Sequence, residues 1–136
     1  NLGRGRVLRA AVQSPTYSAR YYDPRGPQEL YYDLPSVPYL KLAAVHDEPA
    51  GMMTIFALNR HLEEDITLDF TASGFGALQV GEATQLRHDD LKATNTKSVP
   101  DRVSPAPLPG VQVDGERVSA VLAPASWNVI RLAVKG

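Results

Sequence analysis

The stretch "APASWNVIRLAV", residues Ala123 to Val134, decides the fold. Pro124 prevents a helix from running through it, because proline lacks the backbone N–H and clashes with the preceding turn. Beyond the proline, Ile130, Leu132 and Val134 alternate with other residues and therefore share one face of an extended chain. We predict a strand here that closes a hydrophobic core.

Similar alternation recurs upstream. Residues 40–46 and 51–59 are two strand-like runs joined by a short turn with Pro49, which is typical of a hairpin. The second run is apolar on both faces, so we expect it in the middle of a sheet. Further strands are predicted at residues 6–12 and in a hairpin around Asp114-Gly115. A strand at residues 65–71 should point Ile66, Leu68 and Phe70 inward. A strand at residues 77–86 should carry Leu78, Val80 and Leu86 on one side.

These seven or eight short strands define the fold class. Only residues 60–65 and 89–93 have a helical composition, and both segments are too short to form a stable helix alone. The predicted fold is all-β, an antiparallel β-sandwich that occupies residues 1–136 as a single domain.

Two long connections interrupt the strands. Residues 14–39 contain five prolines and all six tyrosines, without a period of 2 or 3.6, so we predict an irregular loop that packs on a neighbouring domain. Residues 87–110 form a second loop, which is polar and rich in proline. The chain starts with Asn1 and an early Gly-Arg-Gly, and we expect residues 1–5 to be a junction with a missing upstream domain, which makes the chain a fragment.

Composition excludes several functions. The net charge is −1 and the pI is about 6.3, which argues against nucleic acid or a membrane surface as partner. No apolar run approaches the length of a membrane span. The absence of cysteine excludes disulfides and thiolate chemistry, and it is compatible with a reducing compartment.

Candidate reactive groups are few. His46, His61 and His88 each have carboxylates nearby, but no helical pairing or third ligand accompanies them, so we predict solvated strand ends and no metal site. The acid pairs at residues 63–64 and 89–90 are expected to be solvated turns, because a glycosidase needs two carboxyl groups in unlike environments across a cleft. We predict no catalytic residue and no cofactor in this chain.

The aromatic residues are the more informative candidates. Aromatic side chains stack on sugars, and they equally bury one face against a protein while their polar atoms find partners. We favour an interdomain contact and keep sugar stacking as the alternative. Trp127 is expected to be a core or sheet-end anchor. The residues concerned are Tyr17, Tyr21, Tyr22, Tyr31, Tyr32, Tyr39 and Trp127.

Five stretches together resemble one family in their order along the chain. They are "GRGRVLRAAVQSPTY" (residues 3–17), "VPYLKLAAVHDE" (37–48), "MTIFALNRHLEED" (53–65), "LRHDDLKATNTKSVPDRVSP" (86–105) and "LAPASWNVIRL" (122–132). The chain resembles the C-terminal region of bacterial α-L-arabinofuranosidases of glycoside hydrolase family 51. "DLKATNT" followed by "PASWNVIRL" is the most specific pair, and residues 18–36 depart most from the family pattern.

The resemblance implies that the β-sandwich is of the jelly-roll kind. It also implies a (β/α)₈ barrel upstream that removes terminal α-L-arabinofuranosyl units from arabinan, arabinoxylan or their oligosaccharides. Two barrel glutamates carry the retaining reaction in this family, and no position of this chain matches either. Family members are usually intracellular, that is cytoplasmic, commonly hexameric, and require no metal. The resemblance further implies that the sandwich recruits a strand from the extreme N-terminus of the full enzyme.

Three functions therefore compete. The favoured one is a non-catalytic C-terminal domain that stabilises the barrel and supplies oligomer contacts. The second is a carbohydrate-binding module that uses the tyrosines of residues 14–39. The third is a self-standing small hydrolase, which predicts that this chain alone releases arabinose; we expect no such release.

Overall fold

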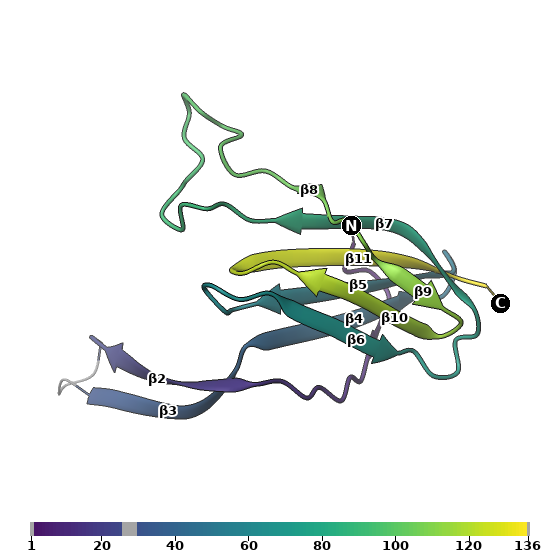
Figure 1. Cartoon of the computed structure of the whole chain (residues 1–136), viewed down its shortest axis with the longest axis horizontal. Helices are drawn as coiled ribbons and strands as arrows, with labels where there is room; N and C mark the ends of the chain where they lie inside the picture. The colour runs from purple at the N-terminus through teal and green to yellow at the C-terminus, as the bar shows by residue number, and fades with distance from the viewer. Residues whose placement is uncertain (1, 26–29, 136) are drawn as a thin grey trace.

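A computed structural model describes residues 2–25 and 30–135, and within these the chain forms eleven strands and no helix. Figure 1 shows two layers of strands and a separate pair that extends away from them. The strands are β1 (Arg6–Leu8), β2 (Thr16–Asp23), β3 (Leu30–Pro38), β4 (Leu40–Asp47), β5 (Met52–Asn59), β6 (Ile66–Thr71), β7 (Leu78–Leu86), β8 (Ala106–Pro107), β9 (Gln112–Asp114), β10 (Arg117–Leu122) and β11 (Ser126–Val134).

The two layers are antiparallel sheets of unequal size. The large sheet has the order β1-β4-β5-β11-β7-β8, and the small sheet has the order β6-β10-β9. The third pair, β2-β3, is a sheet by itself. The all-β sandwich predicted from the sequence is confirmed, and because the described residues contain no helix, no helix among them crosses a membrane.

The core lies between the two sheets. Ile55 of β5 and Ile130 and Leu132 of β11 point inward from the large sheet, where each is at most 2% exposed. Val118 and Leu122 of β10 meet them from the small sheet and are fully buried. Alternate residues of each strand face this interior, which is the reason the period-2 pattern located the strands.

The tight turns and the strand order match the predictions. β4 and β5 form the predicted hairpin, and Gly51 closes its turn with a φ of 61°, in the left-handed region that glycine adopts without strain. Gly115 serves the β9-β10 hairpin in the same way, with a φ of 58°. β5 lies between β4 and β11, so the prediction of a central strand is also confirmed.

Strand β7 differs from its prediction at one point. The pairing of β7 with β11 shifts between Arg131 and Leu132, so that Gly81 is an extra residue on β7. A bulge of this kind exchanges the two faces of the strand beyond it. The prediction that Leu86 shares the side of Leu78 and Val80 is therefore wrong: Leu86 pairs with Trp127, on the opposite face.

The prediction of an irregular loop at residues 14–39 is wrong as well. β2 and β3 pair antiparallel through this region, although residues 26–29 lie outside the described part. We call residues 16–25 and 30–38 the arm, because Figure 1 shows them extending away from the sandwich. The N-terminal strand is also shorter than predicted and ends at Leu8 rather than at Val12. Of the predicted junction 1–5, Asn1 lies outside the described residues.

Candidate functional site

One end of the sandwich collects the irregular features, and we call it the arm end. The arm leaves here just before β4, and the long connection of residues 87–105 leaves here after β7. In Figure 1 both project beyond the strands on the left, the arm below and the connection above. The turn after β5, residues 60–65, lies at the same end.

Each face of the arm carries a pair of tyrosines. Tyr21 lies opposite Tyr32 on one face, and Tyr22 lies opposite Tyr31 on the other. The rings of Tyr22 and Tyr31 are 5.2 Å apart between centroids. These four side chains are between 41% and 58% exposed. A two-stranded hairpin is marginally stable by itself in water, so exposed aromatic residues on both faces make the arm a candidate contact surface.

A cross-strand ion pair accompanies the Tyr22–Tyr31 face. Arg20 and Asp33 pair across the strands, with Nε of Arg20 donating to Oδ1 of Asp33 over 2.9 Å. The Arg20 guanidinium also lies 5.6 Å from the ring centroid of Tyr31. The ion pair is largely exposed, so its net contribution to stability is small. Its main effect is to place charged groups beside the Tyr22–Tyr31 rings, while Asp23 lies on the same face as Tyr21.

A stack of three rings fixes the root of the arm to the sandwich. Tyr17 of β2 lies 4.7 Å from Tyr39, and Tyr39 lies 4.5 Å from His61 in the turn after β5, measured between ring centroids. The backbone N–H of Tyr39 donates to the Pro15 carbonyl over 2.9 Å. The tyrosines of the root therefore have a packing role, unlike those farther along the arm.

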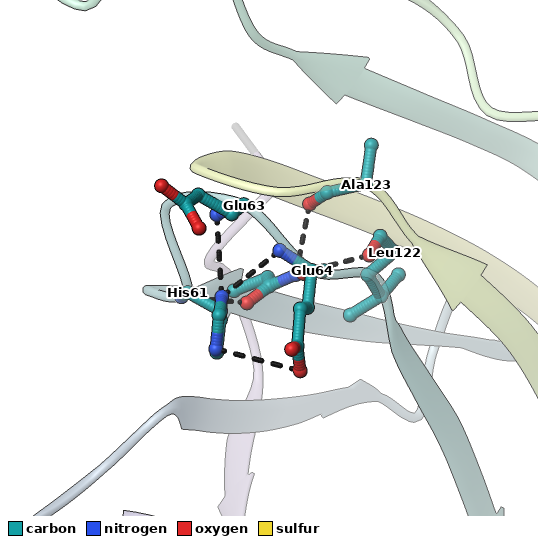
Figure 2. Close-up of polar contacts among 6 residues, drawn as sticks. His61, Glu63, Glu64, Leu122 and Ala123 are labelled. Atoms are coloured by element: carbon teal, nitrogen blue, oxygen red, sulfur yellow. Dashed lines mark hydrogen bonds and ion pairs between the residues drawn. The ribbon is translucent and has the colours of Figure 1, made fainter. Parts of the chain in front are cut away.

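His61 organises the turn through one ring nitrogen (Figure 2). Nδ1 accepts hydrogen bonds from the backbone N–H groups of Glu63, over 3.2 Å, and Glu64, over 2.9 Å. This arrangement assigns the ring proton to Nε2, which lies 3.5 Å from the Glu64 carboxylate. His61 follows the end of β5 as predicted, but its side chain is only 22% exposed rather than solvated, and its task is to hold the turn.

Asn59 connects that turn to the neighbouring β10-β11 connection. Its Nδ2 group donates to the carbonyl oxygens of Glu64 over 3.0 Å, Leu122 over 3.0 Å and Ala123 over 2.9 Å. Its Oδ1 accepts from the backbone N–H of His61 over 2.8 Å. Asn59 is fully buried, and a buried amide needs such partners.

A second buried amide continues this network. Asn128 donates to the Ala57 carbonyl over 3.2 Å and to Ser126 Oγ over 2.9 Å, and its Oδ1 accepts from Gln85 over 2.8 Å. The sequence analysis did not single out Asn59 or Asn128. Polar residues at inward positions of apolar strands are the signal that identifies them.

Trp127 lies only partly as predicted. It is 45% exposed on the outer face of the large sheet, and β11 is an interior strand rather than an edge strand. The inward positions of β11 are the even-numbered ones, so Trp127 necessarily points away from the core. The core alternative predicted for Trp127 is therefore wrong, whereas its place near the start of β11 does lie at an end of the sheet. The structure brings together Tyr17 with Tyr39 and Tyr22 with Tyr31.

The connection of residues 87–105 is held by local polar contacts. Asn95 accepts from the Val103 backbone N–H over 2.7 Å and donates to its carbonyl over 2.8 Å. Asp90 lies 3.4 Å from Arg102, and the Asp90 N–H donates to Nδ1 of His88 over 3.0 Å. In the described residues no three histidines or carboxylates gather as metal ligands would. His46 instead contacts the ring of Phe75 edge-on, with 5.0 Å between centroids.

The clearest electrostatic perturbation lies far from the arm, on the small sheet. Arg117 donates to both oxygens of Asp69, over 3.0 Å and 2.6 Å. This hydrogen bonding lowers the pKa of Asp69 below its ordinary value and raises the pKa of Arg117. Both groups sit on an exposed strand surface, so the pair is a structural contact between β6 and β10.

Taken together, these features define a β-sandwich domain whose described residues present contact surfaces and buried structural amides. The family model for the alpha-L-arabinofuranosidase C-terminal domain matches residues 1–126, and the chain belongs to this family. The resemblance found in the sequence to family 51 arabinofuranosidases is thereby confirmed.

Individual relatives agree with this placement. The chain is 38% identical over 133 residues to an intracellular exo-α-(1→5)-L-arabinofuranosidase of Halalkalibacterium halodurans, covering 98% of this chain and 24% of that protein. It is 33% identical over 130 residues to a Bacillus subtilis enzyme of the same name, covering 96% and 23%. The chain thus spans about a quarter of the length of these curated relatives.

Solved structures show the same fold. A family 51 α-L-arabinofuranosidase from Bifidobacterium longum matches with a TM-score of 0.73 and 27% identity, over 95% of this chain and 23% of that one. The family 51 enzyme from Thermotoga petrophila matches with a TM-score of 0.75 over 92% and 25%, and at 20% identity this likeness concerns the fold alone.

Proposed function

We propose that this chain is the non-catalytic C-terminal domain of an intracellular bacterial α-L-arabinofuranosidase, and that its task is to stabilise a (β/α)₈ catalytic barrel in the same polypeptide. Family membership and the names of the relatives support the activity of the whole protein. The substrates proposed for it are arabinose-containing oligosaccharides with terminal α-L-arabinofuranosyl units. Contacts between copies, up to the hexamer that the resemblance implies, are part of the same proposal.

The observation that carries the stabilising role is the arm. Four tyrosines are exposed on its two faces, and the described parts of β2 and β3 pair only with each other. Ordering such a hairpin costs conformational entropy that its own contacts offset poorly. Burial of its rings against a second domain supplies the missing stabilisation.

A groove at the side of the sandwich supports the proposal further. It has a volume of about 570 Å³ and lies between Leu8 and Leu42 of the large sheet and Leu68 and Phe70 of the small sheet. β6 is the edge strand of the small sheet, and no described residue pairs with its outer edge. An N-terminal strand of the full enzyme, docked beside β6, would cover both the groove and the edge.

Deletion of residues 1–136 from the full polypeptide tests the stabilising role. We expect a lower thermal unfolding midpoint or loss of assembly, while the surviving barrel still cleaves a chromogenic arabinofuranoside. The isolated 136-residue chain should not cleave it. A truncated barrel with unchanged stability and assembly, or turnover by the isolated chain, contradicts the proposal.

A carbohydrate-binding arm is the second candidate. The observation that favours it is the Tyr22–Tyr31 ring pair beside the Arg20 guanidinium, because sugars are bound by aromatic faces bordered by polar groups. Calorimetric titration with arabinan and arabinoxylan fragments separates the two functions. Saturable binding that the double substitution Tyr31→Ala and Tyr32→Ala abolishes favours the module, and absence of binding leaves the stabilising role.

A further inference from the structure

The outer faces of the two sheets differ in polarity. On the small sheet the outward residues are mainly polar, such as Thr67 and Asp69 of β6 and Arg117 of β10. That alternation is normal for a sheet with one face in water. On the large sheet the outward residues nearest the arm end are mainly apolar. They are Phe56 and Leu58 of β5, Trp127 and Val129 of β11, and Leu86 of β7, and the next outward row is polar, with Thr54, Arg131 and Glu82.

The register places these side chains in contiguous rows across the strands. Trp127 pairs with Leu58 on one side and with Leu86 on the other. In the next row, Val129 pairs with Phe56. Trp127 is 45% exposed, so a large aromatic side chain lies at the centre of an apolar patch. A strand sequence that is apolar on both faces is typical of a sheet covered on both sides.

A polar atom within this face also lacks a partner. Nε of Arg131 is buried and makes no hydrogen bond to any described residue, while Nη1 lies 3.6 Å from the Glu82 carboxylate. Buried donors are nearly always paired in native proteins. Because Nε of Arg131 has almost no accessible surface in this chain, its lack of a partner is a local feature of the sheet and not a contact point for a covering molecule.

We propose that the outer face of β5, β11 and β7, centred on Trp127, is the surface on which the remaining part of the same polypeptide packs. This inference rests on the proposed function. The occupant follows from chain length, because about three quarters of each curated relative lies outside the region that this chain matches. A covalently tethered domain has an effective concentration in the millimolar range, so it reaches the patch before a second copy does.

The experiment compares two tryptophans in the full-length polypeptide by hydroxyl-radical oxidation, read by peptide mass spectrometry. Val121, on the outer face of the small sheet, is 54% exposed, which nearly equals the 45% of Trp127. The substitution Val121→Trp therefore provides a matched control side chain on the face that the proposal leaves open. We expect Trp127 to be oxidised about tenfold more slowly than this control, because the centre of an interface is fully buried. If the variant fails to fold, the oxidation of Trp127 in the unmodified polypeptide is compared with that in denaturing urea.

The outcomes separate this proposal from the proposed function. Protection of about fivefold or more that persists when the sample is diluted to monomers supports packing within the polypeptide. Weaker protection of Trp127 from oxidation overturns the proposal. Protection that disappears on dilution also overturns it, and in that case another copy of the chain covers the face. Deletion of the domain can still destabilise the barrel when Trp127 is freely oxidised, in which case the stabilising role stands and the contact lies elsewhere.

Discussion

The side chain of Asn59 holds three backbone segments together at the arm end. It is fully buried, and it donates to the Leu122 and Ala123 carbonyls where β10 ends and to the Glu64 carbonyl in the turn after β5. Replacement by alanine leaves these carbonyls in a dry environment without a donor. We expect Asn59→Ala to lower the free energy of unfolding by about 3 kcal/mol, measured by urea denaturation of the 136-residue chain.

Asn95 provides a matched control for that substitution. It also bonds through its side chain to the backbone, at Val103, but it is exposed, so water replaces the lost contacts. Asn95→Ala should cost less than about 1 kcal/mol. If the two substitutions lower the free energy of unfolding equally, burial of the amide does not determine how much it stabilises the fold.

The pair of Asp69 and Arg117 predicts a dependence on pH. Hydrogen bonding to Arg117 lowers the pKa of Asp69 in the folded state, so the pair stabilises the fold above the unfolded pKa of about 3.9 and loses this effect as the pH falls through the folded value. In Arg117→Gln the pKa of Asp69 should rise toward its ordinary value, as followed by carboxyl NMR titration. Arg20→Gln, remote from the pair, should leave the titration of Asp69 unchanged. A pKa of Asp69 unaffected by Arg117→Gln contradicts the assigned cause.

Among the elements, β1 depends on a single glycine. Gly5 has a φ of 128°, and a Cβ atom there would lie 2.3 Å from the His46 carbonyl oxygen of the adjoining β4. We expect Gly5→Ala to detach β1 at a cost of about 1–3 kcal/mol and to speed amide hydrogen exchange in residues 6–8 without unfolding the core. A Cβ atom at Gly3 would have no neighbouring heavy atom within 4 Å, so Gly3→Ala serves as the control. If the amide hydrogen exchange rates of residues 6–8 are unchanged in Gly5→Ala, β1 remains paired with β4 despite the added Cβ atom.

The longer strands of the sandwich could be predicted because each has one buried face, whereas β8, with both residues exposed, lies within the predicted loop of residues 87–110. Leu68 is buried between the exposed residues Thr67 and Asp69, and such contrast is visible in the sequence. The bulge at Gly81 could not be predicted, since an added residue changes the pairing partner but leaves the composition of the strand unchanged. The side assigned to Leu86 was wrong for this reason.

The arm was missed because it has no buried face. Tyr21 and Tyr22 are both exposed, and so are Tyr31 and Tyr32, so hydrophobicity does not alternate along either strand. The register also shifts near Ser18, where Pro35 and Ser36 lie opposite one residue of β2. Periodicity identifies strands through burial, and it fails where two strands are ordered mainly by each other.

At the scale of the whole molecule, the sequence located the aromatic candidates but not their surroundings. Four of the six tyrosines proposed as a contact surface are exposed, whereas Tyr17 and Tyr39 pack at the root of the arm, and Trp127, assigned to the core or the sheet end, points outward. The direction of Trp127 depends on which face of β11 meets the small sheet, and that is a tertiary property. The network around Asn59 likewise joins residues more than 60 positions apart, so no local pattern contains it.

The arm should contribute little to the free energy of unfolding of the sandwich itself. Tyr17 and Val37 are direct partners, so residues 18–36 can be replaced by Asn-Gly, which forms a tight two-residue hairpin and keeps the Tyr17–Tyr39 stack. In the 136-residue chain we expect the free energy of unfolding to change by less than about 1 kcal/mol, because the excised rings are exposed. In the full-length polypeptide the same excision should lower the thermal midpoint, because there it removes buried interface. A large loss of unfolding free energy in the isolated chain would mean that the arm packs on the sandwich itself. An unchanged thermal midpoint in the full-length protein would mean that the tyrosines of the arm face solvent there as well.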